Sequence, residues 1–187
     1  LIDLYKLKTA LIKLSNNRFI DLIHARSYIT SIAALRFKKA HKIPFIFDMR
    51  GFFADERIDG KIWDKEHFLF KRVYNFFKKK EAEYLQFSNH TISLTSAGKK
   101  EIHSWGLPNL SPITIIPCCT DENLFSQENI KDLRGELGLK DSDFIISYVG
   151  SIGTWYMLDE MLDFFKVLIK KKSDAKFLFI TKDNREK

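Results

Sequence analysis

Short apolar runs alternate along the whole chain with segments whose apolar residues recur at helical spacing. The short runs predict buried strands at residues 19–23, 45–47, 91–94, 113–116, 144–149 and 177–180. The periodic segments predict helices at residues 4–14, 28–42, 63–87, 97–105, 129–138 and 156–172. Continuously apolar strands that alternate with helices build parallel sheets, so we predict an α/β fold with Rossmann-like sheets and flanking helices.

Details of this pattern mark the ends of several elements. Residues 49–62 carry mixed charges between glycines, which predicts a long loop. Ser96 is a suitable N-cap for the helix 97–105, and Gly138 is a typical residue to end the helix 129–138.

The alternation of strands and helices restarts after the polar stretch 121–143. We therefore predict one domain over residues 1–125 and a second over residues 126–187.

The composition excludes several classes of protein. Hydrophobic residues make up 45% of the 187 positions, which is too many for a disordered chain. No apolar run approaches the length of a membrane-spanning helix, and the first residues lack the layout of a signal peptide. The only cysteines, Cys118 and Cys119, are adjacent and cannot form a disulfide framework. We expect a cytoplasmic segment that is cut at both ends.

Positive charge is concentrated in the first part of the chain. Residues 1–100 carry 20 basic and 10 acidic side chains, whereas residues 101–187 carry 11 and 14. Such a basic half favours an anionic partner: a nucleic acid, a phosphorylated small molecule or an anionic membrane surface. Nucleic acid is disfavoured because aromatic residues are not interleaved with the basic ones on exposed strands or in a known binding motif. A solvated basic face is the simpler alternative.

The helix 63–87 carries much of this charge. Its predicted core stripe is Phe70, Val73, Phe77 and Tyr84. Basic residues project from the opposite face, and Phe68 and Phe76 lie near them. This face is suited to contact with anionic lipid headgroups, which would make the protein peripheral on the inner face of a membrane.

Chemistry is expected after the strands, because open parallel sheets bind ligands beyond the carboxyl ends of their strands. On one side of the predicted cleft the candidates are His24, Arg26, Asp48, Arg50 and Ser96. A second candidate site is the turn Gly150, Ser151 and Gly153, whose glycines let backbone amides approach an anion before the helix 156–172.

Each candidate has a simpler interpretation. A histidine at a strand end is usually a hydrogen-bonded structural group, and Asp48 and Arg50 can pair with each other. The glycine turn can be an ordinary connection between a strand and a helix, and the two cysteines are expected to be packed thiols. No spacing of histidines and cysteines predicts a metal site.

Four segments resemble the group 1 enzymes of glycosyltransferase family 4. Residues 113–125 (I-T-I-I-P-C-C-T-D-E-N-L-F) resemble the signature V-I-P-N-G-V-D-x-x-x-F. Residues 21–26 resemble the strand D-V-V-H-A-H, and residues 90–96 resemble A-D-x-V-I-x-V-S. Residues 144–153 resemble the first strand and glycine turn of the donor-binding domain. The order and spacing of the matches agree over nearly the whole chain.

The resemblance implies a partial GT-B architecture, in which two Rossmann-like domains face each other across a cleft. Enzymes of this family transfer a sugar from a nucleotide diphosphate sugar with retention of configuration, usually without a metal ion or another cofactor. Acceptors are often saccharides or lipid-linked intermediates of polysaccharide synthesis. By this resemblance, Gly150, Ser151 and Gly153 contact the donor, and the five candidates after the earlier strands line the acceptor side. No catalytic residue is identified.

The sequence also departs from the family pattern. The Arg and Lys expected after the first donor-domain strand are absent, and Ser151-Ile152 and residues 154–156 stand there instead. Cys118 and Cys119 stand where the signature has Asn-Gly. The acceptor loop and the paired-glutamate motif of the family would lie outside residues 1–187, so the chain alone is expected to be inactive. Two alternatives stay open: a non-catalytic nucleotide-binding or interaction module, and a nicotinamide-dependent oxidoreductase, which the missing third glycine disfavours.

Overall fold

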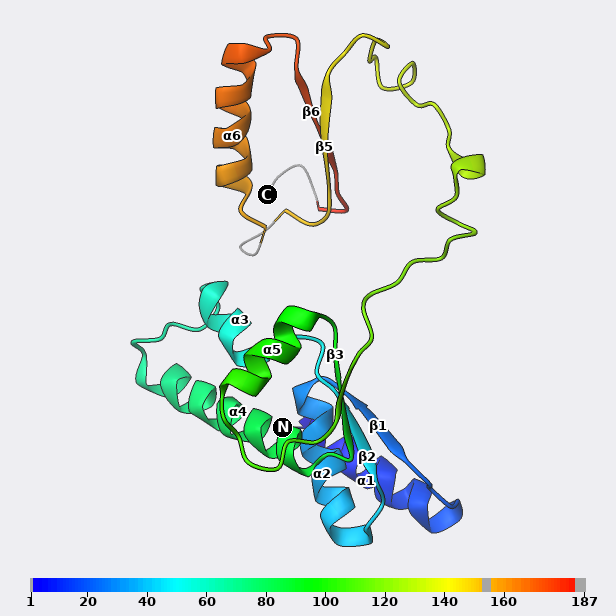
Figure 1. Cartoon of the computed structure of the whole chain (residues 1–187), viewed down its shortest axis with the longest axis vertical. Coiled ribbons are helices and arrows are strands. Elements are labelled where there is room, and N and C mark those ends of the chain that lie inside the picture. The colour runs from blue at the N-terminus through cyan, green and yellow to red at the C-terminus, as the bar shows by residue number, and fades with distance from the viewer. Residues whose placement is uncertain (1, 153–155, 184–187) are drawn as a thin grey trace. The chain divides into compact units, whose positions relative to one another are not determined.

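The chain forms two compact units, which are described separately. The computed structural model describes residues 2–152 and 156–183, and contacts between Cα atoms divide the chain into Leu1–Cys119 and Thr120–Lys187 (Figure 1). The predicted domain ranges 1–125 and 126–187 stay a prediction.

The first unit is a parallel sheet with its connecting helices. Its elements are α1 (Ile2–Asn17), β1 (Ile23–Arg26), α2 (Tyr28–His41), β2 (Phe45–Asp48), α3 (Phe53–Asp59), α4 (Phe68–Phe87), β3 (His90–Ser93), α5 (Ser96–Ser104) and β4 (Ile113–Ile115). The strands lie in the order β1-β2-β3-β4 and all pair in parallel. Because the strands run the same way, their carboxyl ends meet at one edge of the sheet.

Hydrophobic packing is concentrated on one face of this sheet. Ala25, Phe47, Thr91 and Ile113 lie side by side across the four strands, and all four are buried. Helices α2, α4 and α5 contribute the residues that pack against this row, including Tyr28, Leu35, Tyr84, Leu85 and Ile102. The neighbouring row of the other face, formed by His24, Ile46 and His90, is exposed or half-buried. That row therefore keeps polar side chains accessible.

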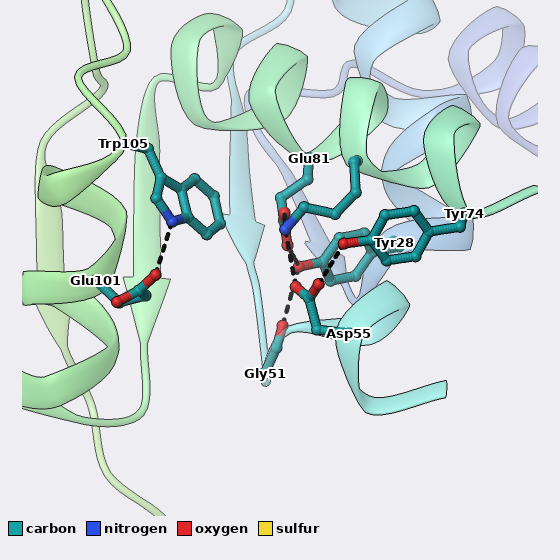
Figure 2. Close-up of polar contacts among 8 residues, drawn as sticks. Tyr28, Gly51, Asp55, Tyr74, Glu81, Glu101 and Trp105 are labelled. Carbon is teal, nitrogen blue, oxygen red and sulfur yellow. Dashed lines mark hydrogen bonds and ion pairs between the residues drawn. The ribbon is translucent and has the colours of Figure 1, made fainter. Parts of the chain in front are cut away.

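A polar cluster that is buried at Tyr28 and Glu81 joins α2, α3 and α4. The fully buried carboxyl of Glu81 contacts the Tyr28 hydroxyl and forms an ion pair with Lys78 (Figure 2). Lys78 also lies 2.8 Å from Asp55, and the Tyr74 hydroxyl donates to Asp55 at 2.7 Å. Burial raises the pKa of Glu81 above its ordinary value, although Lys78 and Tyr28 act in the opposite direction.

The second unit is a β-α-β segment preceded by a mostly irregular stretch. It contains a 3-10 turn (Gln127–Asn129), β5 (Ile145–Val149), α6 (Leu158–Lys171) and β6 (Lys176–Ile180). Strands β5 and β6 pair in parallel over their full length. None of the described residues of this unit is buried. A single β-α-β segment is too small to enclose a core.

Three predicted elements of the first unit are corrected by the structure. The predicted loop 49–62 contains α3, because Phe53 stacks on Tyr28 with ring centres 5.4 Å apart and holds this short segment against the core. The predicted helix 63–87 begins only at Phe68, where the His67 ring accepts a hydrogen bond from the Leu69 amide. The first strand is Ile23–Arg26 rather than 19–23.

Two predicted side-chain roles are also wrong. Val73 was placed in the core stripe, but its side chain is 37% exposed. The N-cap of α5 is Thr95 rather than Ser96, since Thr95 has extended backbone and its hydroxyl accepts from the Gly98 amide at 2.9 Å. Ser96 is the first residue inside the helix.

The predicted helix 129–138 does not form. Turns replace it, with only a 3-10 turn at Gln127–Asn129. The Asp132 carboxylate accepts from the Arg134 amide at 3.0 Å, and the Arg134 side chain donates to the Lys140 carbonyl at 2.9 Å. Local side-chain bonds of this kind compete with the helical pattern, and the segment has no buried side that would favour a helix.

The identity of the α5 cap is testable. Thr95→Ala should lower the free energy of unfolding by about 1 kcal/mol, because the Gly98 amide loses its partner. Ser96→Ala is the matched control and should change it by less than about 0.5 kcal/mol. Urea denaturation of the 187-residue chain measures both, and equal losses would contradict the assignment of Thr95 as the cap.

Candidate functional site

A hollow of about 390 Å³ opens at the carboxyl edge of the first sheet. It is built where β1, β2 and β3 end and where the chain leaves β4. The lining residues are His24, Asp48, Arg50, Ile92, Ile116, Pro117, Cys118 and Cys119. This is the edge at which open parallel sheets bind ligands, because the strand ends leave polar groups accessible there.

His24 and Asp48 form the polar centre of the hollow. His24 is the second residue of β1, and its Nε2 lies 3.3 Å from Oδ2 of Asp48, the last residue of β2. Asp48 is only 8% exposed, and its other oxygen, Oδ1, makes no hydrogen bond within the described residues. A buried carboxylate beside an imidazole fixes the orientation of the ring, so His24 can hold or accept a proton at a defined position.

Arg50 reaches the hollow from a tight turn that follows β2. Its φ is 61°, an uncommon value for a residue with a side chain, and the next residue, Gly51, has φ 147°. This φ is one that residues with a side chain rarely adopt, so glycine is favoured at position 51. Nη2 of Arg50 lies 3.9 Å from Sγ of Cys118. The turn thus places a guanidinium beside the segment that follows β4.

The two cysteines differ from their expected environment. They were predicted to be packed thiols, but both are exposed and both line the hollow. Their position directly after a predicted strand was the sequence signal that they could line a binding site. Strand β4 ends at Ile115 and residues 116–125 are all exposed, so the apolar character of the thiols did not lead to burial.

The structure brings together three of the five predicted acceptor-side residues. His24, Asp48 and Arg50 line the hollow. Arg26 ends β1 and Ser96 begins α5, but both are exposed and neither lines the hollow. Their contribution to a site stays a prediction.

A larger hollow of about 480 Å³ lies at the opposite edge of the sheet. It is lined by the connections that precede β1 and β2, including Arg18, Asp21, His41 and Pro44. Strands begin at this edge, and parallel α/β sheets do not usually bind their ligands there. We therefore assign the candidate site to the smaller hollow.

The predicted donor turn lies in the second unit, and its backbone is engaged within that unit. The Gly150 amide donates to the Ile180 carbonyl at 3.0 Å, and the Ser151 carbonyl accepts from the Tyr148 hydroxyl at 2.9 Å. The Ile152 amide donates to the Asp183 carboxylate. Gly153 lies outside the described residues. The turn therefore already holds one carboxylate on a backbone amide.

Two general features of the described residues complete this picture. No group of three or more histidine, cysteine, aspartate or glutamate side chains within residues 2–152 and 156–183 is arranged to hold a metal ion. Over the same part of the chain, no helix combines the length and apolar character needed to cross a membrane.

Two solved structures of low sequence identity share this fold, and a third has a TM-score below 0.5. A sucrose-phosphate synthase from Thermosynechococcus elongatus has a TM-score of 0.71 at 13% identity, covering 98% of this chain and 43% of that protein. A putative UDP-N-acetylglucosamine 2-epimerase from Listeria monocytogenes has a TM-score of 0.52 at 11% identity, with coverages of 98% and 44%. HepE from Anabaena, solved in complex with UDP-glucose, has a TM-score of 0.49 at 15% identity, with coverages of 86% and 48%. This chain spans less than half the length of each.

The similarity also extends to a family of sequences. No curated protein matches the chain. The family model described as Glycosyltransferase Family 4 matches residues 3–124, which include β1 to β4 and every residue that lines the hollow. The predicted fold class, Rossmann-like parallel sheets with flanking helices, is confirmed, and the chain belongs to glycosyltransferase family 4.

Proposed function

We propose that the complete gene product transfers a sugar from a nucleotide diphosphate sugar to a saccharide or lipid-linked acceptor. We further propose that transfer retains the anomeric configuration and needs no metal ion or other cofactor. The observation that carries this proposal is the family match over residues 3–124, which contains the His24, Asp48 and Arg50 hollow. A hollow with a carboxylate, an imidazole and a guanidinium suits the hydroxyl groups of a saccharide.

The proposed acceptor side is this hollow. Asp48 orients His24, whose imidazole can accept a hydrogen bond from an acceptor hydroxyl. Arg50 supplies a positive charge for a phosphate of a lipid-linked acceptor. Arg26 and Ser96 would extend the same side.

The proposed donor side is the turn after β5, with Gly150, Ser151 and Gly153. A diphosphate on this turn would take the place of the Asp183 carboxylate at the Ile152 amide. The amides and the start of α6 would then stabilise its negative charge. The name of the putative UDP-N-acetylglucosamine 2-epimerase adds support for a nucleotide sugar as the ligand class.

The direct test is an assay of the complete gene product with a panel of nucleotide sugars and saccharide or lipid-linked acceptors. We expect release of a nucleoside diphosphate together with a glycoside of unchanged anomeric configuration, and the same rate in EDTA. The 187-residue chain alone should be inactive, because it spans less than half the length of its structural relatives. Nucleotide binding without transfer in the complete gene product would instead indicate a non-catalytic module.

Arg50→Ala in the complete gene product should lower turnover by about 10- to 100-fold, because a charged hydrogen-bond donor is lost from the hollow. Its melting temperature should stay close to that of the parent. Arg18→Ala is the matched control, since Arg18 is exposed at the opposite edge of the sheet and should leave turnover unchanged. Unchanged turnover in Arg50→Ala would remove this residue from the site.

We also propose that the protein is cytoplasmic and associates with the inner face of a membrane through α4. The side of α4 opposite Glu81 carries Phe68, Leu69 and Phe76, which are 66%, 61% and 45% exposed. Arg72 lies over the Phe68 ring at 5.4 Å, and Lys80 lies over the Phe76 ring at 5.9 Å. Aromatic rings interleaved with cations suit the interface of an anionic bilayer.

Vesicle binding tests this surface without reference to sugar transfer. Arg72→Gln combined with Lys79→Gln should weaken binding to vesicles of phosphatidylglycerol and phosphatidylcholine by about 30-fold at low salt, since each cation near an anionic surface contributes about 1 kcal/mol. The matched control combines Lys6→Gln with Lys13→Gln in α1 and should have little effect on vesicle binding. Equal losses in both variants would contradict a role for α4.

A further inference from the structure

The hydroxyl of Tyr28 lies between two acceptors in the interior of the first unit. Its oxygen is 3.0 Å from the carbonyl oxygen of Gly51 and also contacts Oε1 of Glu81 (Figure 2). Tyr28 and Glu81 are fully buried, so water does not supply a further partner. A tyrosine hydroxyl has a single hydrogen to donate. If Tyr28 donates to Gly51, the contact with Glu81 requires a proton on the carboxyl of Glu81.

The Gly51 carbonyl belongs to the turn that presents Arg50 to the hollow. Arg50 has φ 61°, and left-handed backbone is unfavourable at a residue with a side chain. Such a conformation persists where surrounding contacts fix it. The hydrogen bond from Tyr28 is a contact of this kind, and it reaches the turn from the side of the core.

The groups that face Glu81 come from three helices. Tyr28 approaches from α2, Asp55 from α3 and Lys78 from α4, with Tyr74 bonded to Asp55 behind them. Burial raises the pKa of Glu81, and the repulsion from Asp55 adds to this, whereas Lys78 and Tyr28 oppose it. While Glu81 keeps its proton, it donates to Tyr28, and Tyr28 donates to Gly51. After Glu81 ionises, its carboxylate attracts the Tyr28 hydrogen and the Gly51 carbonyl loses its donor.

We propose that Tyr28 is a positioning residue for the hollow and that its hydroxyl, supported by Glu81, holds the Arg50–Gly51 turn in place. The inference rests on the proposed function only in taking Arg50 as a residue of the site. Neither Tyr28 nor Glu81 lines the hollow. Their effect on a ligand would therefore pass through the turn.

Trypsin cleavage between Arg50 and Gly51 reports directly on this turn, because cleavage requires local opening of the backbone. The 187-residue chain is digested together with an added Arg-Gly peptide. Mass spectrometry measures the cleavage ratio, which is the rate of cleavage at Arg50–Gly51 divided by the rate of cleavage of the peptide. Tyr28→Phe should raise this ratio by about tenfold, as expected when one buried hydrogen bond that closes the turn is lost.

Tyr84→Phe is the matched control. Tyr84 is equally buried and donates to the Tyr28 carbonyl at 3.1 Å, so this variant also loses a buried hydrogen bond in the same core without touching the turn. Its cleavage ratio should stay within about twofold of the parent. Equal increases in both variants would show that Tyr28 acts only on general stability, and would overturn the proposal.

A pH profile separates positioning from general packing. As the pH increases above the ordinary range of a glutamate carboxyl, the parent ratio should rise, because Glu81 loses its proton as the pH passes through its raised pKa. Glu81→Gln should give a low ratio that does not change with pH, since its amide donates to Tyr28 throughout. The added peptide cancels the pH dependence of trypsin itself.

Parallel profiles for the parent and Glu81→Gln would overturn the proposal, and this comparison decides it even if Tyr28→Phe does not fold. Sugar transfer is not a readout in any of these experiments. A failure of the proposed function would therefore leave this result intact, and a flat parent profile would leave the proposed function intact.

Discussion

The carboxyl of Glu81 is the constraint on which the packing of the first unit depends. An ionisable group in the interior is tolerated only where neighbouring groups satisfy it, and here those neighbours lie on different helices. Tyr28 brings α2 to it, and Lys78 connects it to Asp55 of α3. Hydrophobic contacts alone would permit small shifts between these helices, whereas directional polar contacts fix their relative positions. The turn that carries Arg50 is attached to the same cluster through Gly51.

The position of the hollow follows from the one-sided packing of the sheet. The row with Phe47 and Thr91 faces the helices and is apolar or hydrogen-bonded, while the other face of the sheet carries His24, Asp48 and Ile92 toward the hollow. Successive residues of a strand point to opposite faces, so short parallel strands necessarily present alternate side chains at the accessible face. His24 pairs with Ile46, two residues before Asp48, so His24 and Asp48 are diagonal neighbours on that face.

Much of this arrangement could be predicted from the sequence, because it depends on local pattern. The apolar runs located every strand except the first to within one residue at either end, and the polar residues after them identified His24, Asp48 and Arg50. The errors lie where tertiary contacts or side-chain chemistry decide. Helix α3 exists because Phe53 meets Tyr28, which are far apart in the chain. Glu81 was overlooked although it lies four residues after Phe77 and three before Tyr84, on the side of α4 that is buried. Its helical spacing from these two residues indicated burial, whereas the charge of a glutamate favours an exposed position.

The donor turn raises a different physical question, namely what a diphosphate would have to displace. The Ile152 amide already binds the Asp183 carboxylate, and Asp159 and Glu160 occupy the first turn of α6. Asp183 thus occupies an amide, and Asp159 and Glu160 interact with the helix dipole, that an anionic ligand would use. A diphosphate that replaced Asp183 would exchange one anion for another at that amide. The change in local charge would therefore be smaller than for a diphosphate that binds a turn without a carboxylate. The affinity for a donor at this turn would then depend on how much better a diphosphate, with several oxygens, satisfies the backbone than a single carboxylate does.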